Sequence, residues 1–354
     1  MEGGEVHGEG AKGRVIDYGM LTEDLDSLEH IKLKNVTKVK LYIIENDTIA
    51  EYTKGPEIID ELIHYDKNQQ YVIKEFMEPG LASRTLGNTK RSFMMNEING
   101  FKNILPVIKK HNIVGIPYKG NMLIAFEIIM KHKGILFDGT DSRCFVINRK
   151  CSQTMSESIV NNFTEQQFVQ FVEDILKILI DIQNEDVAHG DIKLDNIMSC
   201  NNKYQLIDWE YSRLLNYKFL EKNKYKGLSP MYFKIIYGNL WYPAFKIALL
   251  RYYKETGGYD DGGSEYAKLI IEHYKEWFDK YPTQEIFENV KYSLDLCAFG
   301  MVLYGILLRN KNIKSSHKFF IMNLYKTKNA EAALKLFRNK QPKKQTKKRK
   351  TRKR

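Results

Sequence analysis

The pattern of hydrophobic and polar positions changes along the chain, from short β-branched runs to longer helical repeats. The compact apolar runs QYVIKEF at 70–76 and NMLIAFEII at 121–129 predict strands. Residues 19–68 are mixed and polar, with the β-like pieces VTKVKLYII and EIIDELIHY, and they are typical of an inserted segment. Strand-like runs therefore dominate the first part of the chain.

Helical spacing takes over after Phe163. Apolar residues then recur every three or four positions through Ile182, with Thr164 as an expected N-terminal cap. The run LDLCAFGMVLYGILL at 294–308 is apolar around its whole circumference, which predicts a buried central helix. Strands first and helices later predict an α+β protein with two unlike lobes.

The first glycine-rich stretch, HGEGAKGRVIDYG at 7–19, allows two interpretations. Strands at about 4–7 and 14–18 would form a hairpin, and Gly8, Gly10 and Gly13 would form a loop that cradles phosphate. Alternatively, the stretch is only a glycine-rich, poorly ordered start to the chain. A single GxGxxG pattern does not decide between the two.

Composition excludes several classes of protein. The chain of 354 residues is 43% hydrophobic, enough for a sizeable core, and its apolar runs are too short to span a bilayer or to serve as a signal peptide. We therefore expect a soluble protein of the cytoplasm or nucleus, with no membrane partner. The four cysteines show no CxxC pair or zinc spacing, and we expect them to be reduced.

The net charge of +11 is concentrated at the end of the chain. The last fifteen residues, 340–354, carry ten Lys or Arg and no acidic residue. Such a block repels itself and lacks apolar anchors, so we expect a disordered tail over 336–354. It could contact nucleic acid or direct nuclear import, or it could simply increase solubility.

The segment VAHGDIKLDNIM at 187–198, followed by QLIDWE, carries the strongest chemical signal. A carboxylate at Asp191 can orient an attacking hydroxyl and take its proton, while Lys193 can neutralise charge on a phosphoryl group. Mg²⁺ prefers oxygen ligands and takes few from the protein, which suits Asn196 and Asp208. These residues together predict phosphoryl transfer.

This segment resembles the catalytic loop H-R-D-x-K-x-x-N and the metal-binding D-F-G of eukaryotic-type protein kinases. The resemblance spans about residues 1–310 and implies a two-lobed kinase fold, ATP and Mg²⁺ as cofactors, and a protein Ser or Thr hydroxyl as acceptor. Small-molecule kinases of the choline and aminoglycoside type share a related loop but commonly lack a lysine at the position that corresponds to Lys193. The insertions and basic tail also resemble kinases of large DNA viruses.

Other positions extend the resemblance. Lys74 in YVIKEF matches the strand lysine that grips the α- and β-phosphates, and Glu97 lies at a suitable distance to be its ion-pair partner. HNIVGIPY at 111–118 is similar to the family's H-P-N-I-V segment, and Asp295 resembles the anchoring acid of its central helix. By the same resemblance, Gly8, Gly10 and Gly13 cover the ATP phosphates, with Val15 against the adenine.

The run LIAFEII resembles the strand that leads into the family's hinge. This implies a gatekeeper role for Phe126, and it implies that the backbone of Glu127 and Ile129 faces adenine. The expected N-terminal lobe is thus residues 1–130, with an insertion at 19–68, and the C-terminal lobe is residues 131–335.

Four features depart from the family pattern. Gly190 replaces the catalytic-loop Arg, and Glu210 replaces the glycine of D-F-G, with Trp209 in place of Phe. GLSPMYF at 227–233 only weakly resembles the substrate-side loop, and a helical insertion such as 265–278 is required within about 232–290. The alternatives are therefore a small-molecule kinase and a catalytically weak pseudokinase scaffold.

Overall fold

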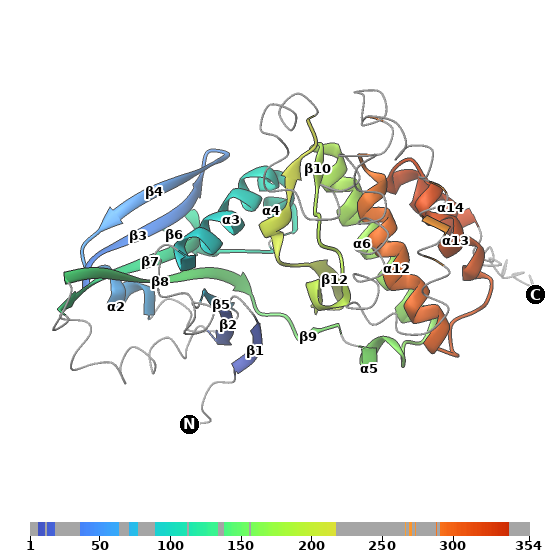
Figure 1. Ribbon diagram of the computed structural model, residues 1–354, viewed down its shortest axis with the longest axis horizontal. Helices are drawn as coiled ribbons and strands as arrows, with labels where there is room; N and C mark the ends of the chain where they lie inside the picture. The colour runs from blue at the N-terminus through green and yellow to red at the C-terminus, as the bar shows by residue number, and fades with distance from the viewer. Residues whose placement is uncertain are drawn as a thin grey trace, which may run out of the picture.

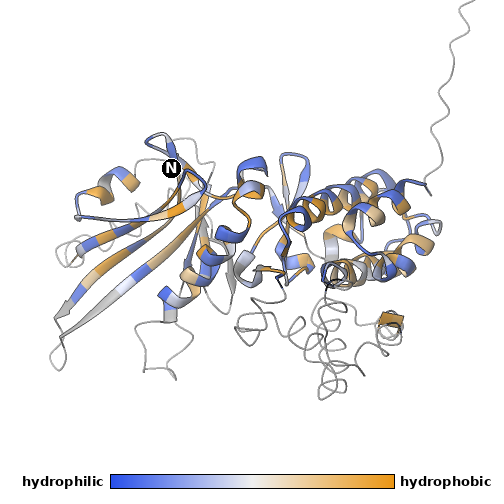
Figure 2. Cartoon of the chain, turned by 90° about the horizontal axis from the view of Figure 1, so that it is seen from above, coloured by the Kyte–Doolittle hydropathy of each residue, from blue (hydrophilic) through white to orange (hydrophobic). Residues whose placement is uncertain are grey.

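The computed structural model describes residues 6–10, 13–17, 36–63, 71–76, 89–111, 113–133, 138–155, 157–216, 266, 269–270, 273, 288 and 291–339. These residues form a mixed α/β fold, with a sheet-rich N-terminal region and helices toward the C-terminus (Figure 1). Apolar positions line the inward faces of the packed elements (Figure 2). The expected α+β class is confirmed at this level.

An eight-stranded antiparallel sheet builds the N-terminal region, in the order β1-β2-β5-β8-β7-β3-β4, with β6 paired to β7. Its strands are β1 (Val6–Gly10), β2 (Gly13–Asp17), β3 (Val36–Glu45), β4 (Thr48–Lys54), β5 (Tyr71–Phe76), β6 (Ile116–Tyr118), β7 (Asn121–Lys133) and β8 (Asp138–Arg149). The predicted strands at 70–76 and 121–129 and the early hairpin are confirmed. The hairpin β3–β4 lies at the edge of the sheet next to β7.

Helices cover both faces of this sheet. On one face α3 (Thr89–Asn103) and α4 (Leu105–His111) add Met94, Ile98 and Ile108 to a large core. On the other face α2 (Ile58–Ile63) adds Ile58, Ile59 and Leu62 to a second, smaller core. The β-like interpretation of EIIDELIHY is therefore wrong over 58–63, because these three residues share one face of a helix.

The sheet extends further along the chain than the sequence pattern indicated. The expected lobe boundary at residue 130 falls inside β7, and β8 follows it as a central strand between β5 and β7. Residues 149–155 then leave the sheet through β9 (Gln153–Thr154), and α5 (Glu157–Val160) is the first helix that follows. This connection, rather than the end of β7, joins the two regions.

The C-terminal region is built around α6 (Glu165–Asn184) and α12 (Ser293–Arg309), with α13 (His317–Asn323) and α14 (Ala330–Asn339) beside them (Figure 1). The expected cap is present: the Thr164 side chain accepts the Gln167 N–H, and the Gln167 side chain accepts the Thr164 N–H. Leu296, Phe299 and Leu303 of α12 are fully buried, as its apolar sequence predicted.

Short strands and 3-10 turns after α6 hold the candidate site. In chain order they are β10 (Val187–Ala188), η2 (Leu194–Asn196), β11 (Ile197–Cys200), β12 (Lys203–Leu206), η3 (Trp209–Tyr211) and β13 (Arg213–Leu214). The strands form two small antiparallel sheets, β10-β13 and β12-β11-β9. They hold the segment 189–196 and Asp208 between the large sheet and the helices.

Candidate functional site

Helix α12 holds the start of the loop at 189–196 in place. The Asp295 carboxylate, 2% exposed, accepts the backbone N–H of His189 at 2.8 Å and that of Gly190 at 3.0 Å. Hydrogen bonds to a charged acceptor are stronger than neutral ones. A residue more than a hundred positions away therefore fixes the backbone just before Asp191.

Gly190 has a conformation that suits glycine alone. Its φ is +82°, and a Cβ at this position would lie 2.8 Å from the carbonyl oxygen of Tyr211. Residues with a side chain rarely adopt this φ, and the space for one is filled. Glycine, at the position where the kinase catalytic loop that this segment resembles has Arg, is thus required by the local structure.

Asp191 lies at the centre of a short hydrogen-bonded network. Its Oδ2 accepts Lys193 Nζ at 2.9 Å and Asn196 Nδ2 at 2.8 Å. Burial alone would lower the pKa of Lys193, but the adjacent carboxylate raises it above its ordinary value. The positive charge of Lys193 is therefore retained beside Asp191.

Asn196 is oriented by its amide nitrogen. Nδ2 donates both to the Asp191 carboxylate and to the Asp191 backbone oxygen, each at 2.8 Å. Neither bond uses the amide oxygen Oδ1, so this atom keeps its capacity to bind a cation.

The Lys74 side chain on β5 links the sheet to helix α3 and to Asp208. Its Nζ donates to Glu97 Oε2 on α3 at 2.8 Å and to Asp208 Oδ1 at 3.1 Å. Burial disfavours the charged amine, but the two carboxylates raise the pKa of Lys74 well above its usual range. Although burial also disfavours ionised Asp208, Lys74 holds the pKa of that carboxyl below its ordinary value. The expected Lys74–Glu97 ion pair is present.

His189 is buried as a neutral ring of defined tautomer. Nδ1 accepts the Asp191 N–H at 3.2 Å, and Nε2 lies 3.1 Å from the Ile207 carbonyl oxygen, to which it must donate. Burial lowers the pKa of His189, although the carboxylates of Asp295, Asp191 and Asp208 act in the opposite direction. The neutral ring thus supports the backbone on either side of the site.

The glycine hairpin lies beside Lys74 in the sheet. Gly8 and Gly10 belong to β1 and Gly13 begins β2, so these glycines flank the turn rather than forming a loop of their own. β2 pairs directly with β5, with Val15 opposite Lys74. The long insertion in between forms β3, β4 and α2 without separating these two strands.

The expectation for Glu127 and Ile129 is wrong. Both lie inside β7, paired on one side with β3 and on the other with β8, so their backbone groups lie within the sheet ladders. Glu127 is 2% exposed, and its Oε2 lies 3.4 Å from Arg91 Nε. Phe126 stacks on Phe145 on the α2 side of the sheet, away from Lys74. β7 was expected to lead out of the sheet because LIAFEII resembles the hinge strand of kinases, but the chain forms β8 before it leaves the sheet.

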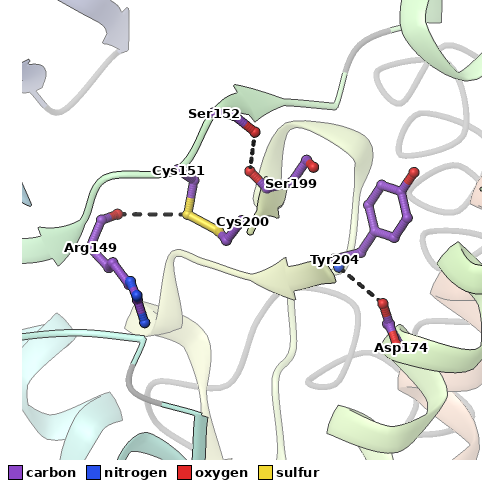
Figure 3. The surroundings of a disulfide bond; sticks show 7 residues. All are labelled: Arg149, Cys151, Ser152, Asp174, Ser199, Cys200 and Tyr204. Carbon is purple, nitrogen blue, oxygen red and sulfur yellow. Dashed lines mark hydrogen bonds between the residues drawn. A yellow bond between two sulfur atoms is a disulfide. The ribbon is translucent and has the colours of Figure 1, made fainter. Parts of the chain in front are cut away.

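A disulfide closes the connection that actually leaves the sheet. Cys151 is bonded to Cys200 at the end of β11, with their Cα atoms 4.5 Å apart (Figure 3). Next to it, Ser152 donates to the Ser199 carbonyl oxygen through its N–H at 2.9 Å and its hydroxyl at 2.8 Å. The expectation of four reduced cysteines is wrong for this pair, because strand pairing brings together residues that lie 49 positions apart. Cys144 and Cys297 are thiols, and both are buried.

The donor set fits a magnesium ion. Asn196 and Asp208 offer an amide oxygen and a carboxylate, and Mg²⁺ is commonly held by one or two protein oxygens together with phosphates and water. Within the described ranges, no group of three His, Cys, Asp or Glu side chains is arranged to hold a metal ion by itself.

Several sequence-based expectations lie outside the described residues. These are the turn between β1 and β2, the Glu210 side chain, GLSPMYF at 227–233, most of the helical insertion at 265–278, and residues 340–354 of the basic tail. The expectation of a disordered tail is wrong over 336–339, because these residues form the last turn of α14, where Phe337 is buried in the core. In the part of the chain that is described, no helix is long and apolar enough to cross a membrane.

No protein-family model matches the chain, and no curated protein sequence matches it.

Proposed function

We propose that this protein is an ATP- and Mg²⁺-dependent phosphotransferase with a two-lobed protein-kinase fold, and that its acceptor is a protein Ser or Thr hydroxyl. The observation that carries the proposal is the position of Lys74 between Glu97 and Asp208, with Asp191 on the adjacent loop. A lysine held between two carboxylates can bind phosphate oxygens. The nearby Asp191 carboxylate and Asn196 amide supply the general base and a metal ligand that phosphoryl transfer needs.

The sheet supports the same proposal. The β1–β2 hairpin adjoins the strand of Lys74, so backbone N–H groups of Gly8, Gly10 and Gly13 would cover the phosphates that Lys74 would orient. Val15, opposite Lys74, would pack against the adenine. We propose that the adenine is faced by residues 149–155, where the chain leaves the sheet, and not by Glu127 and Ile129.

In this mechanism Asn196 and Asp208 would hold Mg²⁺, which would neutralise charge on the phosphates when bound. Lys74 orients the α- and β-phosphates. Asp191 accepts a hydrogen bond from the acceptor hydroxyl and takes its proton during transfer, and Lys193 stabilises charge on the moving phosphoryl group. Asp295 and the neutral His189 hold the Asp191 backbone in place.

The test is transfer of label from γ-labelled ATP to generic protein acceptors and, in parallel, to choline and aminoglycosides. The expected result is Mg²⁺-dependent labelling of protein Ser or Thr that Asp191→Ala abolishes. Labelling of the small molecules alone would establish the small-molecule alternative. Absence of any transfer, together with absence of ATP binding, would support the pseudokinase scaffold.

A further inference from the structure

Helix α3 packs closely against the segment that follows Asp208. A Cβ on Gly100 would lie 2.0 Å from the backbone oxygen of Trp209, far inside any permitted contact. The Trp209 side chain is 1% exposed, so this segment is enclosed by the protein. The helix can approach η3 this closely only because residue 100 has no side chain.

Two hydrogen bonds fix the same contact. Asn103 Nδ2, on the last turn of α3, donates to the Ser212 backbone oxygen at 3.1 Å. The Ser212 hydroxyl donates to the Gly100 backbone oxygen at 3.3 Å. Ser212 is fully buried, and its N–H donates to the Trp209 oxygen at 2.9 Å. Buried bonds of this kind are costly to break because their partners do not regain water.

This contact joins the two elements that carry the partners of Lys74. Glu97 lies one turn before Gly100 on α3, and Asp208 immediately precedes η3. Both carboxylates reach the same amine, at 2.8 and 3.1 Å. A shift of α3 away from η3 would therefore separate the two acids and withdraw Glu97 from Lys74.

We propose that Gly100 and Asn103 are positioning residues: they set the separation of Glu97 from Asp208 and so hold Lys74 in its working place. The proposal rests on the phosphotransferase function for its catalytic consequence. Its structural consequence is independent of that function, because the Lys74 amine is enclosed by its contacts with Glu97 and Asp208 whether or not phosphate is transferred. Neither residue touches the reacting groups; each acts through α3.

The first measurement is the reactivity of Lys74 toward an amine acylating reagent in the full-length protein, read by mass spectrometry. The variants are Gly100→Ala, Asn103→Ala and Asn103→Asp, with Lys102→Ala on the exposed side of the same turn as the matched control. The Lys74 side chain is 17% exposed while it contacts Glu97, and loss of that contact would open its amine to the reagent. We expect all three variants to increase labelling of Lys74 and the control to match the wild type.

The two Asn103 variants are compared by how much each increases the labelling of Lys74. Which of them has the larger effect distinguishes a positioning role from a packing role. Asp keeps the shape of Asn but places an acceptor against the Ser212 oxygen, so positioning predicts that Asp is more disruptive than Ala. A packing role predicts the opposite rank. If Gly100→Ala does not fold, the Asn103 pair still decides the question.

Steady-state kinetics supply the second measurement. We expect a rise in KM for ATP together with a fall in kcat in Asn103→Asp, and neither change in Lys102→Ala. Unchanged labelling of Lys74 in both Asn103 variants would overturn the positioning proposal. If labelling responds but the wild type transfers no phosphate, the positioning inference stands and the proposed function fails.

Discussion

The carboxylate of Asp295 accepts the backbone N–H of Gly190 at 3.0 Å, across 105 positions of sequence. It holds Gly190 at a φ of +82° that other residues avoid. The backbone entering the candidate catalytic loop is thus set by a helix that carries none of the proposed catalytic groups.

Replacing Gly190 should therefore be costly. Gly190→Ala places a Cβ 2.8 Å from the Tyr211 oxygen and forces Ala into the left-handed region, and the backbone conformation alone should lower the free energy of unfolding by about 1–2 kcal/mol. Denaturant unfolding measures this loss. Gly190→Arg, which introduces the residue of the kinase motif that this loop resembles, should be at least as destabilising; an Arg variant of wild-type stability would contradict the structure.

The proposed chemistry separates Asp191 from Asp208. Asp191→Ala should lower kcat by about 10²–10⁴ because a general base is lost, with little change in Mg²⁺-ATP binding. Asp208→Ala should weaken Mg²⁺-ATP binding as well, because its carboxylate is a proposed metal ligand. Calorimetric titration of nucleotide, with and without Mg²⁺, distinguishes the two. Equal turnover in wild type and Asp191→Ala would contradict the mechanism.

Burial of neutral His189 makes stability depend on pH. Its pKa is lower in the folded than in the unfolded state, so the unfolded chain binds more protons once the pH falls below about 6.5. Its contribution to stability is present above that pH and is lost as the pH falls toward the folded pKa. Thermal unfolding between pH 7.5 and pH 5 should show a falling Tm. The Tm of His189→Gln should depend less on pH over about the same range, because the Gln amide can donate and accept as the neutral ring does but does not titrate.

The disulfide can be tested by counting thiols. In denaturant without reductant, alkylation should modify only Cys144 and Cys297, and after reduction it should modify all four cysteines. Denaturant is needed because burial raises the pKa of the Cys144 thiol to about 12. Four modified thiols before reduction would contradict the bond.

Loss of the disulfide should also lower stability. Cys200→Ser in the unreduced protein should cost about 2–4 kcal/mol, since the bond closes a long loop in the unfolded chain. Reductant should have the same effect on wild type and no further effect on the variant, which serves as its control. A variant as stable as the oxidised wild type would show that the hydrogen bonds between 152–155 and β11 are sufficient to hold this connection.

Local patterns predicted the parts of the structure in which short-range signals agree. The helix that begins after Thr164 has its cap, its helical spacing and its buried face in one continuous stretch. The strand of Lys74 is likewise compact and β-branched. The Lys74–Glu97 pair was found because the resemblance named two residue types at a suitable distance, and the fold places them in contact.

The errors arose where strand order decides the outcome. Nothing local in LIAFEII shows that β7 is followed by another strand in the sheet, so Glu127 and Ile129 were misplaced. The pairing of Cys151 with Cys200 depends on the register of β9 on β11, which cysteine spacing does not encode. Gly100 and Asn103 were missed for a related reason: a helical glycine with a polar residue three positions later becomes informative only when the neighbouring segment is known.

The long insertion between β2 and β5 affects how the sheet edge assembles. Closing a flexible loop costs only about 0.6 kcal/mol more for each doubling of its length, so joining Asp17 to Tyr71 through the hairpin and α2 is thermodynamically cheap. The pairing is nevertheless non-local, and such contacts form slowly. The β1–β2 edge is therefore expected to join the sheet late in folding. Because it has a neighbour on one side only, its amides should exchange with solvent before those of β7 and β8.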